Sequence, residues 1–384
     1  MAEGQGTARR SGGQRRVIAP PIPPQRQRIP HLAALTGLRG IAAWFVVLYH
    51  ARLSLAEWMP GAGIAIAAKG YLAVDLFFML SGFVMWLNYG ARLRQQGLAG
   101  APAFWWRRVT RIWPLHGAVL GALVVFALVL LATGRDMANY PFAQLPLHLL
   151  LIQNWGLTAE LSWNHPAWSI SAELGAYLLF PLAVAAARWE EMRPAALVAG
   201  VAGAALALHG VFALAGAETL GEQIPRLGLV RCIIQFGIGM MLANLWLAWR
   251  DRRGRAMACA IVAALASAAL WLFELPETLV IPLALAAMLL ALALDSGPVA
   301  RVLSVRPLVW LGDVSYATYL VHFPLLIIFK LVAVDEDLQI SPAVFAAYAL
   351  VLLALSGGLY RWLEKPAQSW LNGRMPKSAK PASA

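Results

Sequence analysis

Charged side chains are scarce in this chain. Asp, Glu, Lys and Arg make up 13% of its 384 residues, against about 25% in ordinary soluble domains. So little charge cannot cover the surface of a water-soluble protein of this size. Cysteine is scarcer still. Cys232 and Cys259 both lie in apolar segments, which argues against a disulfide framework and against a CxxC metal or redox site. A cleavable signal peptide and an internal repeat are also absent from the pattern.

Long apolar runs make up most of the chain. Hydrophobic residues make up 60% of the chain, and its mean hydropathy is +0.65. A helix needs about 20 mostly apolar residues to cross a bilayer. The stretch 145–155 is too short, and we interpret it as interfacial or re-entrant. The pattern predicts an all-α, polytopic integral membrane helix bundle of about ten transmembrane helices. The predicted spans are 33–53, 70–90, 115–133, 169–187, 195–215, 229–249, 257–273, 279–295, 314–333 and 343–362.

Both ends of the chain differ from the middle. Residues 1–32 hold six arginines and a proline-rich run, which predicts a disordered, basic cytoplasmic tail. The membrane domain is expected over 33–366. Residues 367–384 are predicted to form a second disordered cytoplasmic tail, with no appended soluble domain.

The basic residues predict the topology. With ten spans and both termini cytoplasmic, 24 of the 31 Lys and Arg fall on the cytoplasmic side, as the positive-inside rule requires. Acids gather in the outer loops, among them the run 335–337. The net charge of +12 therefore reflects topology, and we expect no nucleic-acid partner. We expect a multi-pass protein of the bacterial inner (cytoplasmic) membrane.

Ionisable side chains inside the spans are candidates for function, because burying charge in a bilayer is costly. Arg39 and His50 are eleven residues apart, so they share a helix face to within about 20° and lie about 16 Å apart along the axis. Asp75 is predicted at a similar depth on the next span, where it would orient His50 as a general base. The structural alternatives are a snorkelling arginine, an interhelical histidine and a capping aspartate.

Several motifs occur in a familiar order along the chain. After Arg39 and His50 come DLFF and SGF within 75–83, and then RVTRIWP at 108–114. They are followed by WSISAE at 168–173, LGDVSYATYLVH at 311–322 and EKP at 364–366. In this order the chain resembles the acyltransferase-3 family of integral membrane O-acyltransferases. The resemblance covers about residues 35 to 366. Two features depart from that family's pattern. Leu115 and His116 follow the proline where an aromatic residue is common, and we expect a stand-alone form without a fused esterase-like domain.

The resemblance implies transfer of an acyl group, expected to be acetyl, from acyl-CoA to a hydroxyl of a cell-surface carbohydrate or glycoconjugate. Acyl-CoA would be a co-substrate. No permanently bound cofactor and no metal are expected. His50 and Asp75 would be catalytic, with His50 either activating the acceptor hydroxyl or carrying the acyl group. The phosphates of the donor would bind to arginines. These donor-binding residues are Arg39, Arg107, Arg108 and Arg111. The expected acceptor-binding or pore-lining residues are Trp168, Glu173, Ser81, Tyr319 and His322.

Two other functions compete with this hypothesis. In a transporter or flippase of lipid-linked sugars, the buried Arg, His, Asp and Glu would form a substrate or proton pathway. The lack of an inverted repeat and the order of the motifs argue against it. A non-catalytic scaffold would tolerate loss of His50, and nothing in the sequence favours it.

Overall fold

The computed structural model describes residues 32–333 and 339–375. Most of the two predicted tails, residues 1–31 and 376–384, lies outside the described residues, as do the predicted outer acids at 335–337. The described chain is helical and contains no β-strand. This follows from the apolar composition, because a helix satisfies all its backbone hydrogen bonds internally where no water is available.

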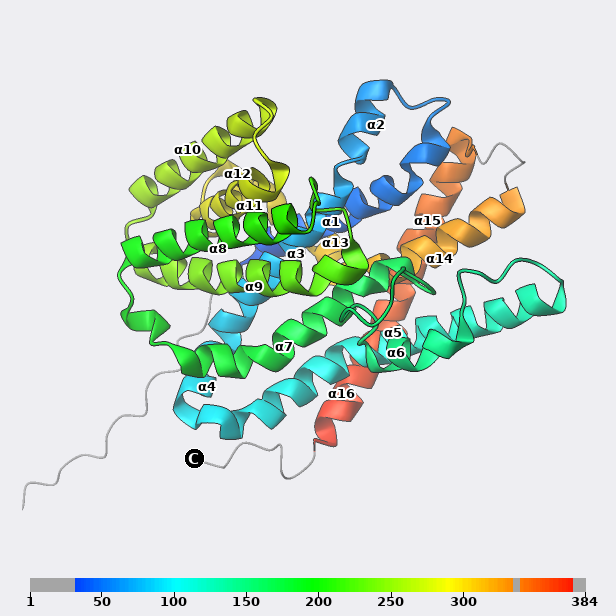
Figure 1. The fold of residues 1–384 in the computed structure, drawn as a ribbon, viewed down its shortest axis with the longest axis horizontal. Coiled ribbons are helices and arrows are strands. Elements are labelled where there is room, and N and C mark those ends of the chain that lie inside the picture. The colour runs from blue at the N-terminus through cyan, green and yellow to red at the C-terminus, as the bar shows by residue number, and fades with distance from the viewer. Residues whose placement is uncertain (1–31, 334–338, 376–384) are drawn as a thin grey trace, which may run out of the picture. The chain divides into compact units, whose positions relative to one another are not determined.

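The longer helices carry the architecture (Figure 1). They are α1 (Ala33–Ala51), α3 (Ala73–Met85), α5 (Ala101–Ala132), α7 (Trp168–Ala186), α8 (Pro194–Leu214), α9 (Ile224–Trp249), α10 (Arg253–Leu272), α11 (Glu277–Leu294), α14 (Ser315–Ala333) and α15 (Pro342–Leu359). The shorter helices are α2 (Gly61–Ala67), α4 (Ala91–Gln96), α6 (Leu145–Leu150), α12 (Pro298–Leu303), α13 (Arg306–Asp313) and α16 (Lys365–Gly373).

Nine helical stretches of the described residues are long and apolar enough to cross a membrane. One of them, 61–132, contains the predicted span 70–90 and all but the last residue of the predicted span 115–133. The two spans are separated by the turn at Gly97, whose φ of +58° favours glycine. All ten predicted spans therefore lie on helices, and the prediction of a polytopic helical membrane protein is confirmed.

The central helices pack through small residues. A Cβ atom placed on Gly82 of α3 would lie 2.0 Å from the carbonyl oxygen of Phe236 on α9. A Cβ on Gly239 of α9 would lie 2.0 Å from the carbonyl oxygen of Met79 on α3. The two backbones thus touch at two points, which is how helices associate in lipid, where apolar side chains gain little from leaving the solvent.

The segment after α5 folds back along that helix. Trp113 of α5 donates from Nε1 to the carbonyl oxygen of Leu149, 3.1 Å away, and His116 Nε2 lies 2.8 Å from the backbone carbonyl oxygen of His148. Burial lowers the pKa of His148 to about 4, so its ring is neutral at pH 7. The stretch 145–155 holds only the six-residue α6 and cannot cross a bilayer by itself. As a result α7 begins beside the middle of α5 (Figure 1).

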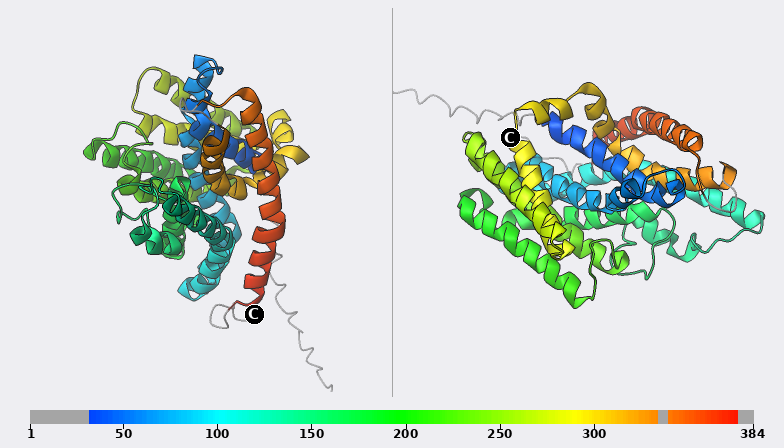
Figure 2. Two further views of the ribbon diagram at one scale, coloured as in Figure 1. Left: turned by 90° about the vertical axis from the view of Figure 1, so that its right-hand side faces the viewer. Right: turned by 90° about the horizontal axis from the view of Figure 1, so that it is seen from above.

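The last helices form one continuous rod (Figure 2). A π-helical turn, Tyr360–Glu364, joins α15 to α16. The helix continues to Gly373, past the predicted domain end at residue 366. Its end is fixed on α5, because Trp106 donates to the carbonyl oxygen of Leu371 and Thr110 donates to Asn372 Oδ1. The predicted disordered tail therefore begins at least seven residues too early.

Candidate active site

A pair of histidines lies between α1 and α14. His50 Nδ1 is 3.2 Å from His322 Nε2 and 3.1 Å from the carbonyl oxygen of Val46. His322 is fully buried, and its Nδ1 is 2.7 Å from the carbonyl oxygen of Tyr319. Tyr348 donates to the carbonyl oxygen of His322 and so fastens this turn of α14.

For neutral rings, these contacts determine the tautomers. A carbonyl oxygen only accepts, so His322 carries its proton on Nδ1 and offers a lone pair at Nε2. His50 Nδ1 faces two acceptors, His322 Nε2 and the carbonyl oxygen of Val46, so it carries the proton of that ring. His50 Nε2 is then unprotonated and free to accept a proton, as a general base requires.

An aromatic side chain separates His50 from a third histidine. The ring of Phe323 lies 5.2 Å from that of His50 and 5.0 Å from that of His165, on which it stacks. Neither Phe323 nor His165 was predicted as a site residue. No feature of the sequence signals this contact, because the two residues come from distant parts of the chain.

The other end of the site is a polar cavity of about 230 Å³. Six of the predicted site residues line it, so helices far apart in the sequence bring them together. These are Arg39, Ser81, Arg108, Arg111, Glu173 and Tyr319. Further lining residues were missed, namely Ser169, Tyr177, Ser315 and Tyr316. The spacing of Ser169, Glu173 and Tyr177, four residues apart on one helix face, could have indicated two of them.

The three cavity arginines differ in their partners. Arg39 donates from Nη2 to Ser315 Oγ, 3.1 Å away, and Arg108 donates to the hydroxyl of Tyr89. Arg111 forms an ion pair with the buried carboxylate of Glu364. Arg39 and Arg108 thus have no carboxylate partner within the described residues, and more of their charge is available to an anion. Arg107, also predicted to bind the donor, lies outside this cavity and lines a separate small hollow with Arg92 and Gln96.

Tyr319 connects the cavity to the histidine pair. Its hydroxyl is 2.8 Å from Ser169 Oγ, and it donates to the carbonyl oxygen of Pro166. Its ring centre lies 5.8 Å from that of His322. The arginines, Tyr319, His322 and His50 therefore form a continuous sequence of contacts and lining residues. Both Tyr319 and His322 were predicted to bind the acceptor or line the pore. Tyr319 lines the cavity, whereas His322 lies outside its lining and contacts His50.

Glu173 lies deeper among the arginines than predicted. It was expected near the depth of His50, but it lines the arginine cavity and accepts a hydrogen bond of 2.6 Å from Tyr177. The Tyr177 hydroxyl is also 2.8 Å from Ser81 Oγ. The reason is the fold-back before α7, which starts this helix level with the middle of α5.

Asp75 does not contact His50. Its two carboxylate oxygens accept hydrogen bonds from Arg231 at 2.8 Å and 2.5 Å, and Gln235 donates to one of them at 3.1 Å. Asp75 and Arg231 are 0% and 1% exposed. The expected orientation of His50 by Asp75 is therefore wrong, because α9 supplies a bidentate cationic partner that was not apparent in the sequence.

Trp168 is not available as a stacking surface for an acceptor. It is buried, with the Arg231 guanidinium carbon 5.4 Å from its ring centre and the Phe78 ring 5.9 Å away. It thus covers the Asp75–Arg231 ion pair.

In the described residues, no group of three or more His, Cys, Asp or Glu side chains has a geometry that could hold a metal ion.

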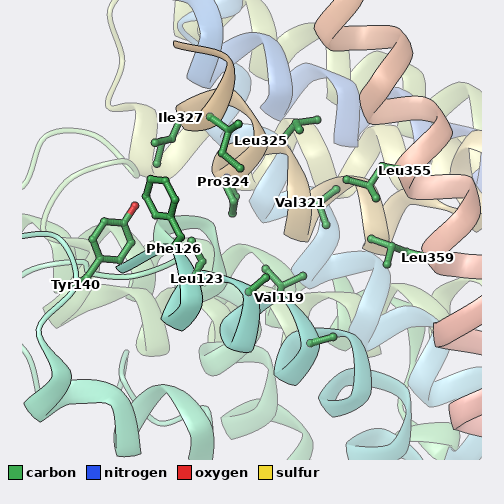
Figure 3. A pocket seen from close by; sticks show the side chains of 13 residues that line it. Val119, Leu123, Phe126, Tyr140, Val321, Pro324, Leu325, Ile327, Leu355 and Leu359 are labelled. Atoms are coloured by element: carbon green, nitrogen blue, oxygen red, sulfur yellow. The ribbon is translucent and has the colours of Figure 1, made fainter. Parts of the chain in front are cut away.

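A second cavity, of about 250 Å³, lies between α5, α14 and α15. Figure 3 shows its side chains, which are hydrocarbon apart from the hydroxyl of Tyr140. It contains no acid, base or cation, so it cannot carry out acid–base chemistry. We therefore assign the candidate active site to the smaller polar cavity and the histidine pair beyond it.

Known proteins resemble this chain over most of its length. A family model described as an acyltransferase domain matches residues 32–361. Acyltransferase MdmB of Streptomyces mycarofaciens is 30% identical over 391 residues, which cover 94% of this chain and 97% of that protein. Protein 2 in the picA locus of Rhizobium radiobacter is 33% identical over 166 residues, or 40% of this chain and 79% of its own.

A Staphylococcus aureus protein, named provisionally as an O-acetyltransferase, is 25% identical over 166 residues. That match covers 41% of this chain and 25% of the Staphylococcus protein. No solved structure gives a significant match. The family model spans most of the helical domain and includes both the histidine pair and the arginine cavity. This chain therefore belongs to the acyltransferase-3 family of membrane acyltransferases.

Proposed function

We propose that this protein transfers an acyl group, with acetyl the expected one, from acyl-CoA to a hydroxyl of a cell-surface carbohydrate or glycoconjugate. One observation carries the proposal: a cavity with three arginines leads through Tyr319 to a histidine whose Nε2 is free to accept a proton. A polyphosphate donor suits the cationic end, and a hydroxyl acceptor suits the basic end.

The arginine end would bind the phosphates of the donor. Guanidinium groups match phosphate oxygens in geometry and keep their charge. Because acyl-CoA is made in the cytoplasm, we place this end of the cavity, and both chain termini, on the cytoplasmic side of the bacterial inner membrane. The donor arm then extends past Glu173, so that its thioester lies near Tyr319.

The histidine end would perform the chemistry. His50 Nε2 takes the proton of the acceptor hydroxyl while the hydroxyl oxygen attacks the thioester carbon. The resulting intermediate collapses with cleavage of the C–S bond, and the leaving thiolate takes the proton from His50. Each step balances without a metal or a redox partner. We propose this direct transfer in preference to a covalent acyl-histidine relay, in which the same unprotonated Nε2 would attack the thioester carbon.

The first test is turnover of acetyl-CoA by the detergent-purified protein, with cell-envelope extract as the acceptor. We expect release of free CoA. We expect Arg108→Ala to raise KM for acetyl-CoA about tenfold to a hundredfold, the value of a charge-assisted contact, with a smaller change in kcat. Arg107→Ala is the matched control, because its side chain lies outside the cavity. If the wild type neither binds nor consumes acyl-CoA, the transporter of lipid-linked sugars becomes the hypothesis to test.

His322 provides a second prediction. His322→Leu removes the acceptor that holds His50 Nδ1–H, and we expect kcat to fall about tenfold to a hundredfold with KM for acetyl-CoA nearly unchanged. His322→Gln can present an amide oxygen at the same place, so it should recover part of the loss. Equal kcat losses in both variants, or a loss confined to KM, would contradict the positioning role. The pH dependence of kcat should also shift in His322→Leu, which a merely structural role would not cause.

A further inference from the structure

One face of α7 runs along the polar cavity. Ser169, Glu173 and Tyr177 are spaced four residues apart, which places them about 6 Å apart along the helix axis, and all three line the cavity. The contacts of the first and last of these residues show which end of the helix face lies nearer the histidine pair and which lies nearer the arginines. Ser169 contacts Tyr319, on the side of the histidine pair, and the guanidinium carbon of Arg108 lies 5.8 Å from the Tyr177 ring centre. Glu173 is therefore halfway between the cationic end and the histidine end.

Only one of the two carboxylate oxygens of Glu173 accepts a hydrogen bond within the described residues. Its Oε1 accepts the hydrogen bond from Tyr177, but no hydrogen bond to its Oε2 occurs within the described part of the chain. No ion pair joins it to Arg39, Arg108 or Arg111 there either, although all four line one cavity. Glu173 Oε2 is accessible from the cavity and is not a buried atom, so a molecule in the cavity can reach it. Glu173 presents an acceptor atom to whatever occupies the cavity.

The donor chemistry supplies a partner. Between the phosphates and the thioester of an acyl-CoA lies the pantetheine arm, which carries two amide N–H groups and a hydroxyl. These groups are hydrogen-bond donors, and a carboxylate is a strong acceptor for them. We infer that Glu173 binds the polar groups of this arm, and this inference rests on the proposed function. The same charge repels phosphate, so it also keeps the phosphates at the arginine end and fixes how far the donor enters.

A set of three acetyl thioesters tests this inference. Acetyl-CoA has both the phosphates and the arm, acetyl-pantetheine has the arm alone, and S-propyl thioacetate has neither. The ratio of kcat/KM between the first two donors measures the phosphate contribution. The ratio between the last two measures the arm contribution. Release of free thiol is followed with cell-envelope extract as the acceptor, for the wild type, Glu173→Ala, Glu173→Gln and Arg108→Ala.

We call the kcat/KM of acetyl-pantetheine divided by that of S-propyl thioacetate the arm ratio, and the kcat/KM of acetyl-CoA divided by that of acetyl-pantetheine the phosphate ratio. We expect Glu173→Ala to reduce the arm ratio about tenfold or more. The phosphate ratio and the rate with S-propyl thioacetate should stay within about twofold of the wild type. Arg108→Ala should show the reverse pattern. Glu173→Gln keeps the shape and the contact with Tyr177, so it should give a smaller loss of the arm ratio. If Glu173→Ala does not fold, the same measurement is made with Glu173→Gln.

Other outcomes overturn the inference. A uniform loss with all three donors would make Glu173 a catalytic or structural residue, and a change in the phosphate ratio alone would make it part of the phosphate site. An unchanged arm ratio in an active enzyme refutes this inference and leaves the acyltransferase proposal intact. If the wild type consumes none of the three donors, the proposed function fails, and this inference fails with it.

Discussion

His50→Ala is expected to lower kcat for acyl transfer by about 100- to 10,000-fold, the contribution of a positioned general base. The expectation rests on the contacts of His50. Its Nδ1 is held between His322 Nε2 and the carbonyl oxygen of Val46, which leaves Nε2 as the only atom of the ring able to take a proton. Alanine removes this acceptor and leaves the arginine cavity unchanged. KM for acetyl-CoA should therefore stay within about threefold of the wild type.

The matched control is His209→Ala. His209 lies on α8, where its Nδ1 is 2.8 Å from Thr278 Oγ1, and it does not line the polar cavity. We expect its turnover to remain near the wild-type value. Thiol release from acetyl-CoA measures kcat, and binding of unreactive CoA measures the donor site separately. If His50→Ala kept more than a tenth of the wild-type kcat while His209→Ala was unaffected, His50 would not be the base.

Loss of Asp75 should lower the stability of the protein, and we expect no direct effect on the chemical step. Asp75→Ala leaves the guanidinium of Arg231 buried without its carboxylate, and removing one partner of a buried ion pair costs about 3–5 kcal/mol. We expect a markedly lower unfolding temperature in detergent, followed by size-exclusion chromatography after heating. Arg231→Met together with Asp75→Leu removes both charges, and this double variant should recover much of the lost stability.

This experiment separates the sequence-based hypothesis from the structure. If Asp75 oriented His50, then Asp75→Ala would melt near the wild-type temperature and lose turnover, and the double variant would be inactive. If Asp75 serves the ion pair, stability falls in the single variant, and the stabilised double variant regains both its fold and its turnover. Normal stability together with lost activity in Asp75→Ala would refute the structural role.

The features that depend on local sequence were predictable. The spans follow from apolar runs, and the placement of Arg39 and His50 along one helix follows from the helical period. Both survive in the structure, because α1 is an uninterrupted helix from Ala33 to Ala51. The order of the motifs along the chain also identified the family, because that order does not depend on how the helices pack.

Pairings between distant helices were not predictable. The partner of Asp75 is Arg231, 156 residues away, and the partner of His50 is His322, 272 residues away. Charge alone made Asp75 and His50 a reasonable pair, but helix packing decides which groups meet. The depth of Glu173 was misjudged for a related reason. A span was assumed to start at the membrane surface, whereas the fold-back along α5 starts α7 within the bundle.

The glycine contacts between α3 and α9 have a mechanical consequence. Two backbones that touch at Gly82 and Gly239 cannot slide past each other without a clash, so we expect these helices to move as one rigid body. Ser81 and the Asp75–Arg231 ion pair belong to this rigid body, so we expect their positions to stay fixed. Admitting and releasing bulky substrates must then be accommodated elsewhere. The apolar cavity between α5, α14 and α15 leaves room for side chains of α14 to move, and this helix also carries Tyr319 and His322.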